Sequence, residues 1–219
     1  SLSMHLPPIT RNLLWIMAAV FLLQQFFEIQ MIPFMLWPFG EFNLGSNSEG
    51  VMQTIGFQPW ELLTYGFMHG GIGHLFFNCL ALYQFGARLE YTWGSKRYLT
   101  FFLVCVVGAG ACQLAFMQFF QQFSGPTIGA SGGVYGLLLG YGMLFPKERI
   151  MLLIPPIPMS VKTLVIVFGA LSLFMGISGV AGGIAHFAHL GGMLFGWLLI
   201  RYWRGQSPFK KQKRGPWGV

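Results

Sequence analysis

Residues 129–145 read GASGGVYGLLLGYGMLF, a serine among glycines followed by an apolar run. The run predicts a helix over 131–145, whose 15 residues span about 22 Å. Because the hydrocarbon core of a bilayer is about 30 Å thick, a membrane helix this short leaves Ser131 below the outer surface. The preceding loop, 121–128, must then dip into the membrane, which is tolerated only where backbone is buried in protein or lines a wet cavity. The stretch therefore predicts a sunken serine with access to water.

Ser131 also lies where the predicted helix begins. Free backbone N–H groups and the positive end of the helix dipole surround such a position and favour a developing oxyanion. The G-x-S-x-G pattern has the form of the turn that carries the nucleophile of many hydrolases. Serine is also a preferred helix N-cap, so this segment alone leaves both a nucleophile and a cap open.

The composition of the whole chain indicates a membrane protein. Of the 219 residues, 54% are hydrophobic and only 9% are charged, whereas about a quarter are charged in soluble domains. The net charge of +7 comes from basic residues clustered at the ends of apolar runs, which orients membrane spans and does not indicate nucleic-acid binding. The cysteines have no metal-binding or paired spacing and are expected to be small buried side chains: Cys79, Cys105 and Cys112.

Six apolar stretches have roughly the length of a membrane crossing. They cover 12–35, 70–91, 97–120, 131–145, 161–178 and 186–203. All 13 Lys and Arg fall at the N-terminal segment, the second and fourth connections and the C-terminal tail, and positive residues stay on the cytoplasmic side. We therefore predict an all-α membrane protein, a six-transmembrane-helix bundle with both termini cytoplasmic. Its expected parts are a cytoplasmic segment, one membrane domain and a basic cytoplasmic tail, at residues 1–11, 12–203 and 204–219.

A second polar group opens the last predicted span, where residues 188–192 read AHLGG and Gly196 follows. Glycines four residues apart let two membrane helices approach closely. Docking of this helix on the fourth span brings His189 near Ser131. The alternative is a histidine that only hydrogen-bonds between helices, and we interpret the neighbouring His186 as structural. The fourth span has its own ridge of small residues at Gly132, Gly136 and Gly140.

A third polar group, His69-x4-His74-x3-Asn78, opens the second span. His74 and Asn78 share a helical face and can direct two hydrogen-bond donors to one point, as an oxyanion hole requires. A metal site and a simple interhelical contact are the alternatives. The H-x-x-x-H spacing of many zinc sites is absent and no acidic ligand is nearby, so we predict no metal and no cofactor.

The acidic residues limit the mechanism. The chain has no aspartate, and its six acidic residues are Glu28, Glu41, Glu49, Glu61, Glu90 and Glu148. Since a Ser-His-Asp triad is excluded, we predict a Ser131–His189 dyad in which packing orients the histidine. Tyr135 lies four residues after Ser131, on the same helical face, and is the expected packing partner.

These three motifs, in this order on a six-span frame, resemble those of the rhomboid family of intramembrane serine proteases, in the minimal bacterial form. The resemblance covers about residues 12–203. It implies that Ser131 is the nucleophile and His189 the general base, and that Tyr135 stacks on His189. It further implies an oxyanion hole and a supporting set of residues: the oxyanion donors are His74, Asn78 and the N–H of Ser131, and the supporting residues include His69, Gly129, Gly192 and Gly196.

The resemblance also implies the substrates: single-span membrane proteins, cleaved near the top of their helix after a small residue. The expected location is the lipid bilayer of a bacterial inner membrane. Two rivals remain, a non-catalytic relative that binds transmembrane clients and a transporter. Two departures stand out, because many relatives carry Trp-Arg where this chain has Trp60-Glu61, and Glu-x-Arg where it has Glu90-Tyr91-Thr92. We expect a differently anchored first loop and a Glu90 without its arginine.

Overall fold

The protein is built mainly of helices. A computed structural model describes residues 6–120, 125–151, 156–178 and 185–206. The α-helices are α1 (Pro8–Phe26), α2 (Glu28–Met31), α3 (Glu61–Thr64), α4 (Ile72–Ala81), α5 (Ala87–Trp93), α6 (Ser95–Phe120), α7 (Ser131–Leu144), α8 (Val161–Ser178) and α9 (His186–Trp203). Two 3-10 turns, η1 (Ile32–Phe34) and η2 (Tyr65–Phe67), flank the first loop, and a π-helical segment, η3 (Leu82–Gly86), joins α4 to α5.

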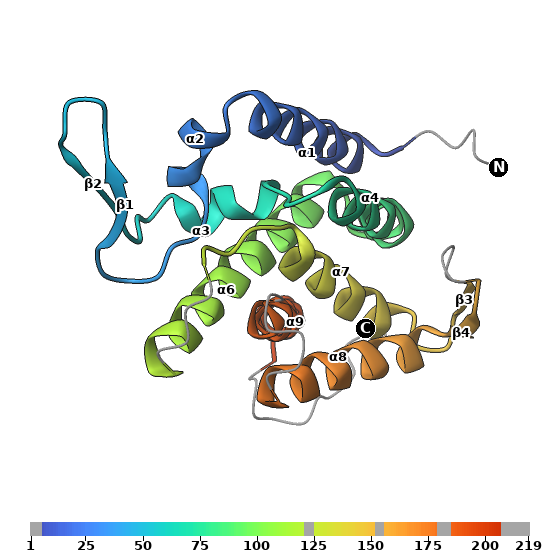
Figure 1. The fold of residues 1–219 in the computed structure, drawn as a ribbon. Coiled ribbons are helices and arrows are strands. Elements are labelled where there is room, and N and C mark those ends of the chain that lie inside the picture. The colour runs from blue at the N-terminus through green and yellow to red at the C-terminus, as the bar shows by residue number, and fades with distance from the viewer. Residues whose placement is uncertain (1–5, 121–124, 152–155, 179–184, 207–219) are drawn as a thin grey trace.

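Helix α9 lies inside the bundle, where it packs against α6, α7 and α8 (Figure 1). Glycines bring these helices together. A Cβ atom added at Gly191 would lie 2.6 Å from Cβ of Cys112 on α6. A Cβ at Gly136 of α7 would lie 2.7 Å from Cβ of Cys105, so α6, α7 and α9 meet almost backbone to backbone.

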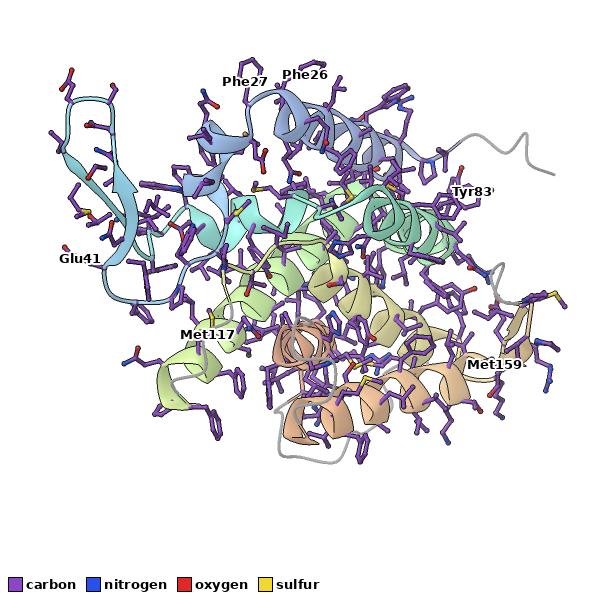
Figure 2. The ribbon with its side chains drawn as sticks, viewed as in Figure 1. Phe26, Phe27, Glu41, Tyr83, Met117 and Met159 are labelled. Carbon is purple, nitrogen blue, oxygen red and sulfur yellow. The ribbon has the colours of Figure 1, made fainter. Side chains whose placement is uncertain are left out.

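The predicted first span, 12–35, is wrong at both ends. Helix α1 begins at Pro8, where proline fits the first helical position because the N–H it lacks would have no intrahelical partner. It ends at Phe26 because Phe27 leaves the helical conformation, with φ −128° and ψ 47°. Figure 2 shows Phe26 and Phe27 pointing away from the body, and they are 74% and 50% exposed.

The structure contains two small antiparallel strand pairs, which the prediction of an all-α protein did not include. Strands β1 (Phe42–Ser46) and β2 (Met52–Ile55) form a hairpin that projects from the body (Figure 1). Its turn is organised by Asn47, whose Oδ1 accepts the N–H groups of Glu49 at 3.0 Å and Val51 at 2.9 Å. Strands β3 (Arg149–Met151) and β4 (Pro158–Ser160) pair between α7 and α8.

Two of the described helices, α1 and α6, are long and apolar enough to cross a membrane, and a shorter apolar helix covers Val161–Met175. Helix α7 has 14 residues, close to the short helix predicted over 131–145. The predicted second span corresponds to α4, η3 and α5 in succession. The six-span count and the cytoplasmic termini stay predictions at this point.

Glu90 joins the start of α1 to the end of α5. The carboxylate is 2% exposed and accepts the N–H of Thr10 at 2.7 Å and the N–H of Ile9 at 2.9 Å. The hydroxyls of Thr10 and Ser95 donate to it as well, at 2.9 and 2.7 Å. Its partners are therefore a helix N-terminus and two hydroxyls, which suit a buried negative charge.

Glu61 anchors the first loop. Its fully buried carboxyl group accepts the N–H of Trp37 at 2.8 Å and the N–H of Gln58 at 3.0 Å. Burial raises the pKa of Glu61, and these two hydrogen bonds partly offset the rise. A carboxyl group at this position therefore binds the loop through backbone N–H groups, whereas an arginine would have to bind backbone carbonyls.

Candidate active site

Ser131 is the first residue of α7, and Gly129, two residues earlier, has a backbone conformation that favours glycine. Gly129 has φ +123° and donates its N–H to the carbonyl of Tyr65 at 2.9 Å. A Cβ at Gly129 would lie 2.7 Å from Cε1 of His74. A side chain is therefore excluded both by the backbone conformation and by the His74 ring, and this glycine lets His74 lie beside the start of α7.

His189 of α9 lies against Ser131. Its Nε2 is 2.9 Å from Ser131 Oγ, and the side chain is only 8% exposed. One face of the imidazole is covered by Tyr135, whose ring is stacked at 4.2 Å with an interplanar angle of 7°. The Tyr135 ring in turn meets Phe168 of α8 edge to face at 6.2 Å. Within the described part of the chain, the histidine is thus held by an aromatic stack and not by a carboxylate.

The approach of α9 to α7 depends on Gly192, and its approach to α6 depends in part on Gly196. A Cβ at Gly192 would overlap the carbonyl oxygen of Gly132 on α7, whereas one at Gly196 would crowd Phe101 at 3.0 Å and Sγ of Cys105 at 3.2 Å, both on α6. These contacts fix the register in which His189 faces Ser131. The spacing of small residues along both helices is the signal from which the docking was predicted.

His74 and Asn78 lie on α4, on the other side of Ser131. The His74 side chain is exposed, and its Nδ1 accepts the N–H of Gly70 at 3.4 Å. Asn78 is buried, and its amide donates to the carbonyl of His74 at 3.0 Å. The structure thus brings His74 to the Gly129 turn, while the Asn78 amide is engaged within its own helix.

The His69 ring packs edge to face against the His74 ring, with centroids 4.9 Å apart. Its backbone is paired with a side chain that the sequence analysis did not single out. Gln24 of α1 donates to the carbonyl of His69 at 2.9 Å and accepts its N–H at 3.0 Å. The available signal was a glutamine pair, Gln24 and Gln25, in an otherwise apolar span.

An apolar cavity of about 230 Å³ opens beside the serine, between α4 with η3 on one side and α7 with α8 on the other. Ser131, Tyr135 and Asn78 line it together with Phe77 and Phe168. Within the described residues, no three His, Cys, Asp or Glu side chains come together as a metal site requires. The cavity adjoins the serine hydroxyl and has room for an apolar side chain.

The fold and site define a mainly helical protein with a serine–histidine pair at a helix N-terminus. Comparison with known proteins gives the family: residues 56–205 match the rhomboid domain, and the chain belongs to the rhomboid family. RHOMBOID-like protein 4 of Arabidopsis thaliana is 32% identical over 163 residues, 74% of this chain and 39% of that protein. Rhomboid protease GlpG of Photorhabdus laumondii is 26% identical over 215 residues, 97% of this chain and 67% of that protein.

A third relative, Rhomboid protein 1, mitochondrial, of Saccharomyces cerevisiae is 28% identical over 165 residues, 72% of this chain and 46% of that protein. The chain thus spans less than half the length of the plant and yeast relatives. The predicted family membership is confirmed. Members of this family are integral membrane proteins, and relatives named rhomboid protease show that it is a protease family.

Proposed function

We propose that this protein is an intramembrane serine endopeptidase that cleaves transmembrane proteins with a Ser131–His189 dyad. The observation that carries the proposal is the 2.9 Å contact between Ser131 Oγ and His189 Nε2 at the N-terminus of α7. A nucleophile and a base within hydrogen-bond reach, with the base oriented by a third group, are the requirements of acyl transfer. Tyr135 provides that orientation by stacking.

In the proposed reaction, His189 Nε2 removes the Ser131 proton as Oγ attacks the scissile carbonyl. The negative charge that develops on the carbonyl oxygen is stabilised by the N–H of Ser131, which lies in the first helical turn and has no intrahelical partner. His74 and Asn78 are the proposed additional donors, and the Asn78 amide must turn from its bond with the His74 carbonyl to take part. The protonated His189 then protonates the leaving amine, and water hydrolyses the acyl-enzyme.

The proposed substrates are single-span membrane proteins. A helical backbone is fully hydrogen-bonded, so the substrate helix must unwind locally to present its peptide bond to Ser131. Helix-weakening Gly or Pro residues near the cleavage site favour that step. The apolar cavity beside Ser131 is consistent with a substrate that arrives from lipid.

We also propose six crossings with both termini cytoplasmic, in a bacterial inner membrane. The proposed crossings are α1, the α4–α5 helix, α6, α7, α8 and α9, with residues 1–11 and 204–219 on the cytoplasmic side. The distribution of Lys and Arg supports this orientation. Topology reporters fused at each terminus test it: a reporter active on the outer side at one end only contradicts the even count, and outer activity at both ends contradicts the orientation.

Labelling of the detergent-solubilised protein with a fluorophosphonate, with the modified residue mapped by mass spectrometry, tests the dyad. We expect an adduct on Ser131 in the wild type and none in Ser131→Ala or His189→Ala, while all three proteins unfold at similar temperatures. Cleavage of a single-span substrate in liposomes should be lost in the same two variants. A folded wild type that neither labels nor cleaves favours a protein that binds transmembrane clients without cutting them.

A further inference from the structure

His186 lies one helical turn before His189, at the start of α9, and both side chains are buried, with 6% and 8% exposure. The two imidazoles meet edge to face, with centroids 6.1 Å apart and an interplanar angle of 88°. Among the residues that the structure describes, neither His186 Nε2 nor His189 Nδ1 has a hydrogen-bond partner. Two buried polar atoms without partners, on adjacent turns of one helix, are costly and call for an explanation.

The proposed reaction requires one particular tautomer of the His189 ring. Its Nε2 must be unprotonated to accept the Ser131 proton, so the neutral ring carries its own proton on Nδ1. A buried N–H without an acceptor loses its hydrogen bond to water and is destabilising. In a Ser-His-Asp triad, a carboxylate accepts this hydrogen bond and holds the ring in the reactive tautomer.

Among the residues that the structure describes, no carboxylate is placed to accept this hydrogen bond. Three glutamates are engaged elsewhere, as Glu61 binds backbone N–H groups of the first loop, Glu90 binds the start of α1 and Glu148 accepts the hydroxyl of Tyr141. The other three are exposed at the surface: Glu28, Glu41 and Glu49. Tyr135 covers a face of the His189 ring and offers no acceptor in the plane of the ring.

We propose that His186 supplies this acceptor through one ordered water molecule, which receives the Nδ1–H of His189 and donates to Nε2 of His186. Directly hydrogen-bonded imidazoles have centroids about 5 Å apart, so the observed 6.1 Å favours a bridging water over a direct bond. His186 is then a positioning residue that acts through His189 and does not touch the substrate. This inference rests on the proposed protease function.

The test compares His186→Phe, which keeps a ring and removes the acceptor, with His186→Gln, which restores a polar group. Phe187→Leu is the matched control, because Phe187 lies on the same turn but stacks on Phe116 at 4.0 Å. The readouts are the rate of fluorophosphonate labelling of Ser131, kcat and KM for a single-span substrate, and the unfolding temperature.

We expect His186→Phe to lower the labelling rate and kcat by about five- to ten-fold with KM unchanged. His186→Gln should recover most of that loss, and Phe187→Leu should keep the wild-type rate. Wild-type kinetics in His186→Phe overturn the role of His186 and leave the protease proposal standing. A wild type that neither labels nor cleaves overturns the protease proposal itself.

A second measurement uses the unaltered protein, in case His186→Phe does not fold. NMR of the protein with 15N-labelled histidine reports which ring nitrogen carries the proton. We expect His189 to be protonated on Nδ1 and His186 to be unprotonated on Nε2 at neutral pH. A protonated Nε2 on His186 contradicts the proposed bridge.

Discussion

Gly192 of α9 packs directly on the carbonyl oxygen of Gly132 in α7, so closely that a Cβ at Gly192 would overlap that oxygen. Gly132 follows Ser131, and Gly192 lies three residues after His189. A tight backbone contact between these helices therefore lies next to the serine–histidine pair, and we expect the distance between the two proposed catalytic side chains to depend on it.

Gly192→Ala should force α7 and α9 apart, because backbone cannot move aside as the end of a side chain can. We expect a loss of about 1–3 kcal/mol in unfolding free energy and a loss of serine labelling that exceeds the unfolded fraction. Gly169→Ala on α8 is the control, since its added Cβ would meet only the flexible Met193 side chain, at 3.4 Å. Equal labelling of the two variants would contradict the assigned role of the glycine contact.

We expect Glu90 to contribute to folding stability and not to the reactivity of Ser131. Glu90→Ala leaves two N–H groups at the start of α1, one buried and one partly buried, and two hydroxyls without their acceptor. We therefore expect a loss of about 3 kcal/mol in unfolding free energy. Glu90 lies 16 residues after His74 along the second span, roughly 24 Å away in a helix. Below its unfolding temperature, the variant should therefore label Ser131 at the wild-type rate, and a selective loss of labelling would contradict this separation.

The sequence was sufficient to predict the parts of the fold that depend on local spacing. The glycine ridges of α7 and α9 predicted which helices dock, and the short apolar run after Ser131 predicted the position of α7. Contacts between distant residues carried no comparable signal. Gln24 pairs with the backbone of His69, and Glu90 with the start of α1, because the fold brings together residues 45 and 80 positions apart. The end of α1 was missed since Phe26 and Phe27 are as apolar as the helix they end.

We expect Tyr135 to contribute to catalysis through its aromatic ring and not through its hydroxyl group. Tyr135→Phe retains the stack on His189 and should cleave at close to the wild-type rate, whereas Tyr135→Leu removes it. An aromatic stack contributes about 0.5–1.5 kcal/mol, so we expect the leucine variant to lose up to about ten-fold in kcat. Comparison of kcat for the two variants on one substrate checks this, and equal loss in both would point to the hydroxyl.

His69 should make the protein sensitive to acid. Burial, and then the neighbouring His74, lower the pKa of His69 to about 4, and a contact with the Phe67 backbone offsets part of the shift. The unfolded chain takes up this proton first as pH falls below about 6.5, so stability is lost between that pH and about 4, by up to about 3 kcal/mol. His69→Phe should flatten the fall in unfolding temperature across this range. A parallel fall in both proteins would assign the acid sensitivity to other groups.

Alanine substitutions at Gly129 and Gly125 distinguish the effect of backbone strain from the effect of a steric clash at the candidate active site. Both have positive φ, +123° and +124°, so alanine is strained at either position. At Gly129 the added Cβ meets the His74 ring at 2.7 Å, while at Gly125 it meets none of the residues that the structure describes within 4 Å. Backbone strain should therefore cost each variant about 1–2 kcal/mol, and Gly129→Ala should in addition displace His74 and lower kcat by at least about ten-fold more. Equal kcat in the two alanine variants would show that catalysis does not depend on the position of His74. It would then contradict the assignment of His74 to the proposed oxyanion hole.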